Sequence, residues 1–265
     1  MGRWHFLIKV FNYIEELINT DDDTYTAILD RVSSELSNNQ PSPFNWFVQA
    51  SIRNAAKPFA TDSSRNGKLQ RLIDFNLTEV GLTCFERVSS LLSAPISDLE
   101  LHIVPAIDQF GGGCCIAPGK VLVAVKIDEF SPVRLQRNVA HEYSHSVRMT
   151  QKPQATEHGY GHEVPYTIRD YLIFEGLAMV LSDTLYPSPI QPHDVSDTEE
   201  EAWWNKVNLD AVGMKGYVDY IGLRAYEIGS RIVRAYLGNR DISVLQAHYL
   251  TDGELYWRSG YRDIK

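Results

Sequence analysis

Hydrophobic residues recur at steps of three and four over most of the first forty positions. In the segment 3–18 they mark one face of a helix: Phe6, Val10, Tyr13, Ile14 and Leu17. The same spacing returns after the acidic residues 21–23, so we predict that the first forty residues are helical. The segment 38–43, NNQPSP, interrupts the pattern because its prolines do not fit inside a regular helix. A further helical stretch is predicted over 65–93.

The pattern changes near residue 99. LELHIVP at 99–105 alternates, GGGCCIAP at 111–118 is short and glycine-rich, and KVLVAVKI at 120–127 is dense in β-branched residues. All three are predicted strands. Pro118-Gly119 has the residues of a type II turn, so we expect a hairpin between the last two strands. Helical spacing then returns, and helices are predicted over 132–149, 166–185, 197–207, 222–237 and 242–249.

This order of elements predicts an α+β fold that is mainly helical, with a small sheet before the 132–149 helix and a helical C-terminal part. The proline-containing segment 38–43 is the candidate boundary. We therefore divide the chain into 1–60, an N-terminal helical segment that packs on or is appended to the core, and 61–265, the main domain. The pattern does not indicate whether 1–60 inhibits, recruits or only packs, nor what the oligomeric state is.

Composition and charge narrow the classes of partner. The 265 residues are 44% hydrophobic and carry a formal net charge of −9, which disfavours nucleic acid as a partner. No apolar run approaches the roughly 20 residues of a membrane span, and the N-terminus lacks the features of a signal peptide, so we expect a cytoplasmic protein. Cys84, Cys114 and Cys115 offer neither a disulfide framework nor a metal knuckle, which indicates a reducing compartment, and we expect Cys114 and Cys115 to be small buried strand residues.

The decapeptide AHEYSHSVRM at 140–149 contains the pattern HExxH, in His141, Glu142 and His145. Four residues advance a helix by about 400°, so both imidazoles leave nearly the same face and can bind one zinc ion at about 2.0 to 2.1 Å. Glu142 lies beside that face. It can therefore reach a water molecule on the metal without being a ligand, which is the position that a general base needs.

A catalytic zinc ion has three protein ligands and one exchangeable water, so a third ligand is required. The metzincin pattern would place glycine at 148 and histidine at 151, but this chain has Arg148 and Gln151. A carboxylate on a following helix is the other solution, and Glu175 supplies it among apolar neighbours, where a dication would compensate its charge. Gly176 beside it indicates a close approach, which we assign to the helix that carries His141.

The segment HEYSH followed by FEGLA resembles the YjaZ-like family of predicted zinc peptidases, whose sites are of the gluzincin type. The similarity extends over roughly 60–250. It implies a zincin-like metallopeptidase with zinc as cofactor, His141, His145 and Glu175 as ligands, and Glu142 as the general base.

Hydrolysis of a peptide bond in a peptide or protein substrate is the reaction that fits such a site, because zinc lowers the pKa of a bound water while Glu142 accepts its proton. The developing oxyanion needs a donor besides the metal. Our choice is Tyr226, which lies in a predicted helix where the family resemblance continues. His162, in the loop HGYGHE, is the alternative.

Two other functions fit the same residues: a non-catalytic metal-binding or protein-interaction module, and a zinc hydrolase of non-peptide amides, which the ligands alone do not separate from a peptidase.

The role of the strand 120–127 is also open. As an edge strand it would pair with an extended substrate peptide, whereas as an interior strand it would have no free edge.

Overall fold

The computed structural model describes residues 7–38, 48–49, 51–107, 112–151, 166–188, 195–212 and 224–261. The chain divides into two compact units, Met1–Thr150 and Gln151–Lys265.

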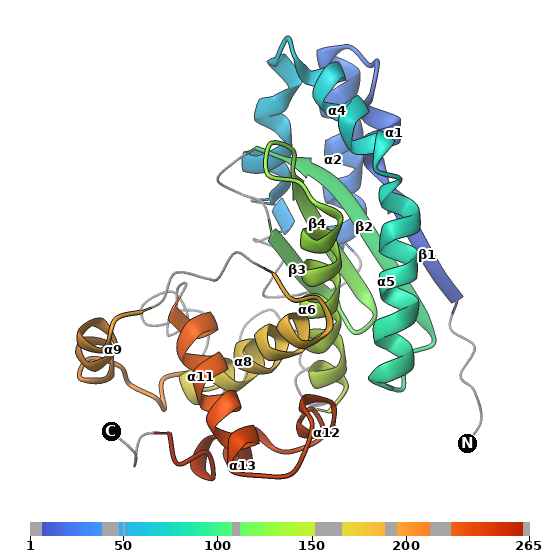
Figure 1. Cartoon of the computed structure of the whole chain (residues 1–265). Helices are drawn as coiled ribbons and strands as arrows, with labels where there is room; N and C mark the ends of the chain where they lie inside the picture. The colour runs from blue at the N-terminus through green and yellow to red at the C-terminus, as the bar shows by residue number, and fades with distance from the viewer. Residues whose placement is uncertain are drawn as a thin grey trace. The chain divides into compact units, whose positions relative to one another are not determined.

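The first unit is built around a four-stranded sheet with the order β1-β2-β4-β3 (Figure 1). Its strands are β1 (Leu7–Asn12), β2 (Asp98–Ala106), β3 (Gly112–Ala117) and β4 (Lys120–Lys126). The first three strands in that order run parallel, and β3 pairs antiparallel with β4. The predicted hairpin is confirmed, with Gly119 at a φ of +82° in the turn. Because β4 lies between β2 and β3, it is an interior strand and cannot take up a substrate strand along its edge.

The N-terminal segment differs from the prediction. Within the predicted helix 3–18, Leu7–Asn12 is the strand β1, and only Tyr13–Leu17 is helical, as α1. β1 pairs with β2 from Leu7 opposite Asp98 to Asn12 opposite Ile103. The helix predicted from the apolar spacing was therefore wrong here. The segment LIKVFN, with Ile8, Val10 and Phe11, also suits a strand, and pairing with a strand about ninety positions away decides between the two.

A buried histidine fixes this N-terminal strand to the sheet. The ring of Phe11 stacks on His102 of β2 with centroids 4.7 Å apart, and the hydroxyl of Tyr13 lies 3.0 Å from its Nδ1. Burial, and after it the charge of Lys120, lowers the pKa of His102 to about 4, so the ring is neutral at neutral pH. Residues 7–17 are thus an integral part of the first unit.

Helices complete the first unit. They are α2 (Asp22–Asn38), the short η1 (Ser51–Ala56) and η2 (Lys57–Thr61), α4 (Arg65–Asp74), α5 (Leu77–Leu91) and α6 (Pro132–Thr150). α5 and α6 pack on each other, and Figure 1 shows both over the same face of the sheet. Gly81 lets α5 approach the sheet closely, since a Cβ there would lie 2.6 Å from Leu101 Cδ2 of β2. The predicted helix 65–93 is split at Asn76, whose φ of +49° is left-handed and whose side chain caps α5.

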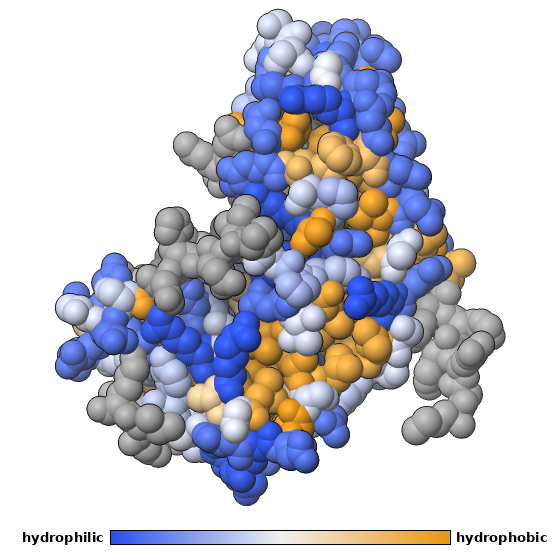
Figure 2. Space-filling view, viewed as in Figure 1, coloured by the Kyte–Doolittle hydropathy of each residue, from blue (hydrophilic) through white to orange (hydrophobic). Residues whose placement is uncertain are grey.

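The surface of this unit is uneven in polarity. In the space-filling view, the end of the unit that holds α1, α2 and α4 is mostly hydrophilic (Figure 2). Ion pairs account for part of it: Arg31 contacts Glu16 and Glu35, and Lys57 contacts Asp30.

The second unit is helical in its described part, apart from a bridge between Thr167 and Val212. It contains α8 (Ile168–Leu185), α9 (Asp197–Trp204), α11 (Arg224–Gly238), α12 (Val244–Ala247) and α13 (Asp252–Trp257). The predicted helices 166–185, 197–207 and 222–237 are confirmed to within a few residues. The predicted helix 242–249 is shorter than expected, and α13 was not predicted.

The central contact of the second unit is the crossing of α8 and α11. A Cβ on Gly176 would lie 2.3 Å from the carbonyl oxygen of Gly229, and a Cβ on Gly229 would lie 2.1 Å from the carbonyl oxygen of Leu172. The two backbones touch at this point, and only glycine fits on either side. Gly176 therefore serves a contact with α11, and our assignment of this glycine to a contact with the His141 helix was wrong.

We expect Gly229→Ala to lower the free energy of unfolding of the second unit by at least about 2 kcal/mol, because the added methyl group meets backbone rather than a side chain that can move. Urea denaturation followed by tryptophan fluorescence measures this effect. Gly238→Ala is the matched control on the same helix, since a Cβ there has nothing within 4 Å. Equal urea midpoints for the two variants would contradict the tight crossing.

The expected fold class is confirmed: the protein is α+β and mainly helical, with a small sheet before α6 and helices after it. The predicted division into 1–60 and 61–265 stays a prediction. Among the described residues, no helix combines the length and the apolar character that crossing a bilayer requires.

Candidate metal centre

The helix α6 carries the HExxH pattern, and buried contacts hold it against the sheet and α5. Its buried side includes Tyr143, whose hydroxyl donates to the carbonyl oxygen of Leu92 at 3.0 Å and whose ring meets Phe85 edge-on. On the sheet side, the hydroxyl of Ser146 accepts from the backbone N–H of Gly119 at 3.2 Å. Tyr143 lies between the two histidines in sequence and Ser146 directly follows the second, so these contacts fix the backbone that presents the histidines.

His141 and His145 face each other on one side of α6, as their spacing predicts. Their Nε2 atoms are 3.1 Å apart, and the rings are nearly perpendicular, at 88°. Two Zn–N bonds of about 2.05 Å at a tetrahedral angle would place the nitrogens about 3.3 Å apart. His145 is only 5% exposed and His141 is half-buried. The pair therefore fits two ligands of one zinc ion with little rearrangement.

Glu142 is buried, at 5% exposure, and lies against strand β3. A Cβ on Gly113 of that strand would be 2.6 Å from both Cγ and Oε1 of Glu142. The strand thus leaves the space that this carboxylate occupies, next to the histidine pair on the helix. A buried carboxylate beside two candidate metal ligands has the position expected of a general base.

Glu175 belongs to the second unit, in the middle of α8. The helix begins with a capping box between Thr167 and Asp170, which fixes its first turn. Glu175 is only 6% exposed. Burial raises the pKa of Tyr171, one turn earlier on α8, and the negative charge of Glu175 raises it further. A carboxylate at this depth is costly unless a cation or several donors compensate it. Its burial and its chemistry suit a metal ligand.

Tyr226 also belongs to the second unit, on α11, and is half-buried. It precedes Gly229 by three residues, so it shares the side of α11 that packs on α8. His162, the alternative oxyanion donor, lies outside the described residues. The structure thus pairs the two histidines with Glu142 in the first unit, and it places Glu175 and Tyr226 on two contacting helices of the second.

All three cysteines are buried, which confirms the prediction made for Cys114 and Cys115. Burial raises the pKa of the Cys115 thiol, whose sulfur contacts Ser146 and Met149. A thiol that stays protonated at neutral pH is a poor nucleophile, which argues against a thiol peptidase at Cys115.

Two glycines of this region were not predicted as functional residues. Gly113 leaves room for Glu142, and Gly229 lets α11 approach the helix of Glu175. In the sequence, a glycine inside a predicted strand or helix indicates such a close approach, because glycine is unfavourable there unless another group comes close. The sequence does not indicate which group that is.

Comparison with known proteins gives one match. No curated protein and no solved structure matches the chain. A family model described as "Predicted Zn-dependent protease (DUF2268)" matches residues 102–255, from strand β2 to helix α13, and so covers both the HExxH helix and α8. This agrees with the resemblance seen in HEYSH and FEGLA. Because the match spans more than half of the chain, the protein belongs to this family of predicted zinc-dependent proteases.

Proposed function

We propose that the protein is a zinc-dependent peptidase in which His141, His145 and Glu175 bind the metal and Glu142 is the general base. The observation that carries the proposal is the histidine pair, with Nε2 atoms 3.1 Å apart and the buried Glu142 beside it. Two imidazoles and one carboxylate are a donor set that zinc prefers in gluzincin-like hydrolases, and these three side chains could together hold a metal ion. Membership of the family supports the same metal.

Each residue has a separate task in the proposed reaction. When bound, zinc supplies a water of lowered pKa and polarises the substrate carbonyl. Glu142 accepts the proton of the attacking water and then delivers it to the leaving amine. The hydroxyl of Tyr226 donates a hydrogen bond to the carbonyl oxygen as negative charge develops on it. Strand β3 lies against this carboxylate at Gly113 and so limits the space into which it can turn.

We expect Tyr226→Phe to lower kcat about 10²-fold with little change in KM or in zinc content, because only the oxyanion loses a donor. Tyr236→Phe is the matched control on the same helix, where the hydroxyl faces Glu254 at 3.5 Å. Steady-state kinetics on one peptide measures both variants. An unchanged kcat for Tyr226→Phe would remove this residue from the mechanism and leave His162 as the candidate.

The function itself is tested on the purified protein by metal analysis and by digestion of a peptide library. One zinc ion per chain and cleavage of peptides are expected. Zinc without cleavage of any peptide, but with hydrolysis of small amides, would point to a non-peptide amide hydrolase. A chain that binds no zinc, or binds it without any hydrolysis, would be an interaction module. The cytoplasmic location stays a prediction from the sequence.

A further inference from the structure

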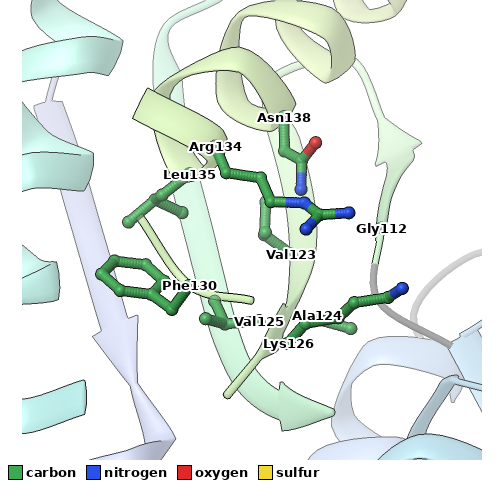
Figure 3. A pocket seen from close by; sticks show the side chains of 9 residues that line it. All are labelled: Gly112, Val123, Ala124, Val125, Lys126, Phe130, Arg134, Leu135 and Asn138. Atoms are coloured by element: carbon green, nitrogen blue, oxygen red, sulfur yellow. The ribbon is translucent and has the colours of Figure 1, made fainter. Parts of the chain in front are cut away.

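A small pocket with both apolar and charged lining residues lies beside the first turns of α6, on the same unit as the histidine pair (Figure 3). Its volume is about 10 Å³, which is room for one water-sized group rather than for a large side chain. Figure 3 shows Arg134 and Asn138 reaching into the same space from α6, with Lys126 extending toward it from the end of β4. Phe130 and Leu135 form an apolar wall on the other side.

The described residues that line the pocket include two cations and no carboxylate. Arg134 and Lys126 both contact one carboxylate, that of Glu129, which is about half exposed at the rim. Among the ion pairs of the described residues, these two cations share a single anion, which leaves one positive charge for a further partner. The amide of Asn138 adds a neutral donor on the same side. One oxygen of a carboxylate fits this volume, and guanidinium and ammonium groups bind carboxylates by charge-assisted hydrogen bonds.

The pocket and the proposed catalytic residues lie along the same helix, α6. Arg134 and Asn138 precede His141 by seven and three positions on α6, which is about 10 Å and about 4.5 Å along the helix axis. Strand β3 runs beside them, with Gly112 lining the pocket and Gly113 against Glu142. An extended peptide advances about 3.3 Å per residue, so a group bound at Arg134 would be two or three residues away from the reacting carbonyl.

We propose that Arg134, Lys126 and Asn138 form a recognition site for a carboxylate of the substrate, two or three residues from the cleaved bond. This rests on the proposed peptidase function and adds a substrate preference to it. The carboxylate is either an aspartate or glutamate side chain or the C-terminus of the substrate chain. Both sources present the same planar anion to the two cations.

The test compares peptides that differ in one charge. Wild-type protein should cleave a peptide with glutamate two or three residues from the cut at least about tenfold more efficiently, in kcat/KM, than the same peptide with glutamine there. Arg134→Gln should bring this ratio close to one, Lys126→Gln should reduce it, and Arg134→Lys should keep part of it. Amidated and free-acid peptides distinguish a C-terminal carboxylate from a side chain.

Arg31→Gln is the matched control. Arg31 is ion-paired with carboxylates and is 46% exposed at its side chain, close to the 42% of Arg134, but it does not line this pocket. It should leave the preference unchanged. Circular dichroism and the melting temperature show whether each variant is folded.

A wild-type preference below about twofold for every acidic peptide, side-chain or C-terminal, would overturn the carboxylate site. So would a preference that survives in both Arg134→Gln and Lys126→Gln. Failure of the peptidase function is seen separately, as no cleavage of any peptide by the wild type. In that event the affinities of the glutamate and glutamine peptides for the zinc-loaded Glu142→Gln variant, measured by fluorescence anisotropy, still test the pocket: a tenfold difference supports it and equal affinities overturn it.

Discussion

Replacement of Glu142 by glutamine is expected to lower peptide hydrolysis by about 10²- to 10⁴-fold while the zinc content stays at one ion per chain. The amide has nearly the same size as the carboxylate, so it still fits the space that Gly113 leaves on strand β3. It cannot accept a proton from the attacking water, however, and proton transfer by a positioned base contributes this range of rate. Zinc is retained because Glu142 is proposed as a base and not as a ligand.

Kinetics and metal analysis on the same preparation separate these two effects. Glu86→Gln, on α5 of the same unit and on an exposed position, is the control for the loss of one negative charge. It should cleave at the wild-type rate. If Glu142→Gln also cleaves at that rate, the base is another group. If it loses zinc together with activity, Glu142 supports the metal, and its assignment as a pure base is wrong.

The parts of the fold that could be predicted are those whose structure is determined by residues close together in the sequence. The hairpin of β3 and β4 follows from β-branched residues and from Pro118-Gly119, whose backbone preferences fit the turn without help from the rest of the chain. The helix α6 follows from its apolar spacing, and His141 and His145 from that helix. In each case the residues that predict the element lie within about twenty positions of one another.

The parts that could not be predicted depend on distant partners. β1 is a strand because it pairs with Asp98–Ile103 and because Phe11 stacks on His102, and neither partner is visible in the spacing of residues 3–18. Gly176 shows that something approaches α8, but the sequence does not say that it is Gly229 of α11. The same limit applies to the site, where Gly113 is recognisable as a strand glycine but not as the neighbour of Glu142.

Glu175 was inferred as the third ligand from its chemistry and from the family resemblance, and zinc affinity is the direct test of this assignment. We expect Glu175→Ala to weaken zinc binding by more than the 10- to 100-fold that loss of an outer hydrogen-bond partner of a ligand costs, because a direct ligand is removed. Hydrolysis should fall with the zinc content. Two imidazoles remain, so binding is weakened rather than abolished. Competition with a chromophoric chelator gives the affinities of wild type and variant.

Stability gives a second, independent measure of the same ligand. A metal that binds only the folded chain raises the melting temperature as its concentration exceeds Kd. The shift with added zinc should be large for wild type and much smaller for Glu175→Ala at the same zinc concentration. Asp183→Ala is the control on the same helix, since that carboxylate pairs with Arg234 at 2.6 Å and should leave the zinc-dependent shift intact. A Glu175→Ala variant that binds zinc as tightly as wild type would show that another group completes the coordination of His141 and His145.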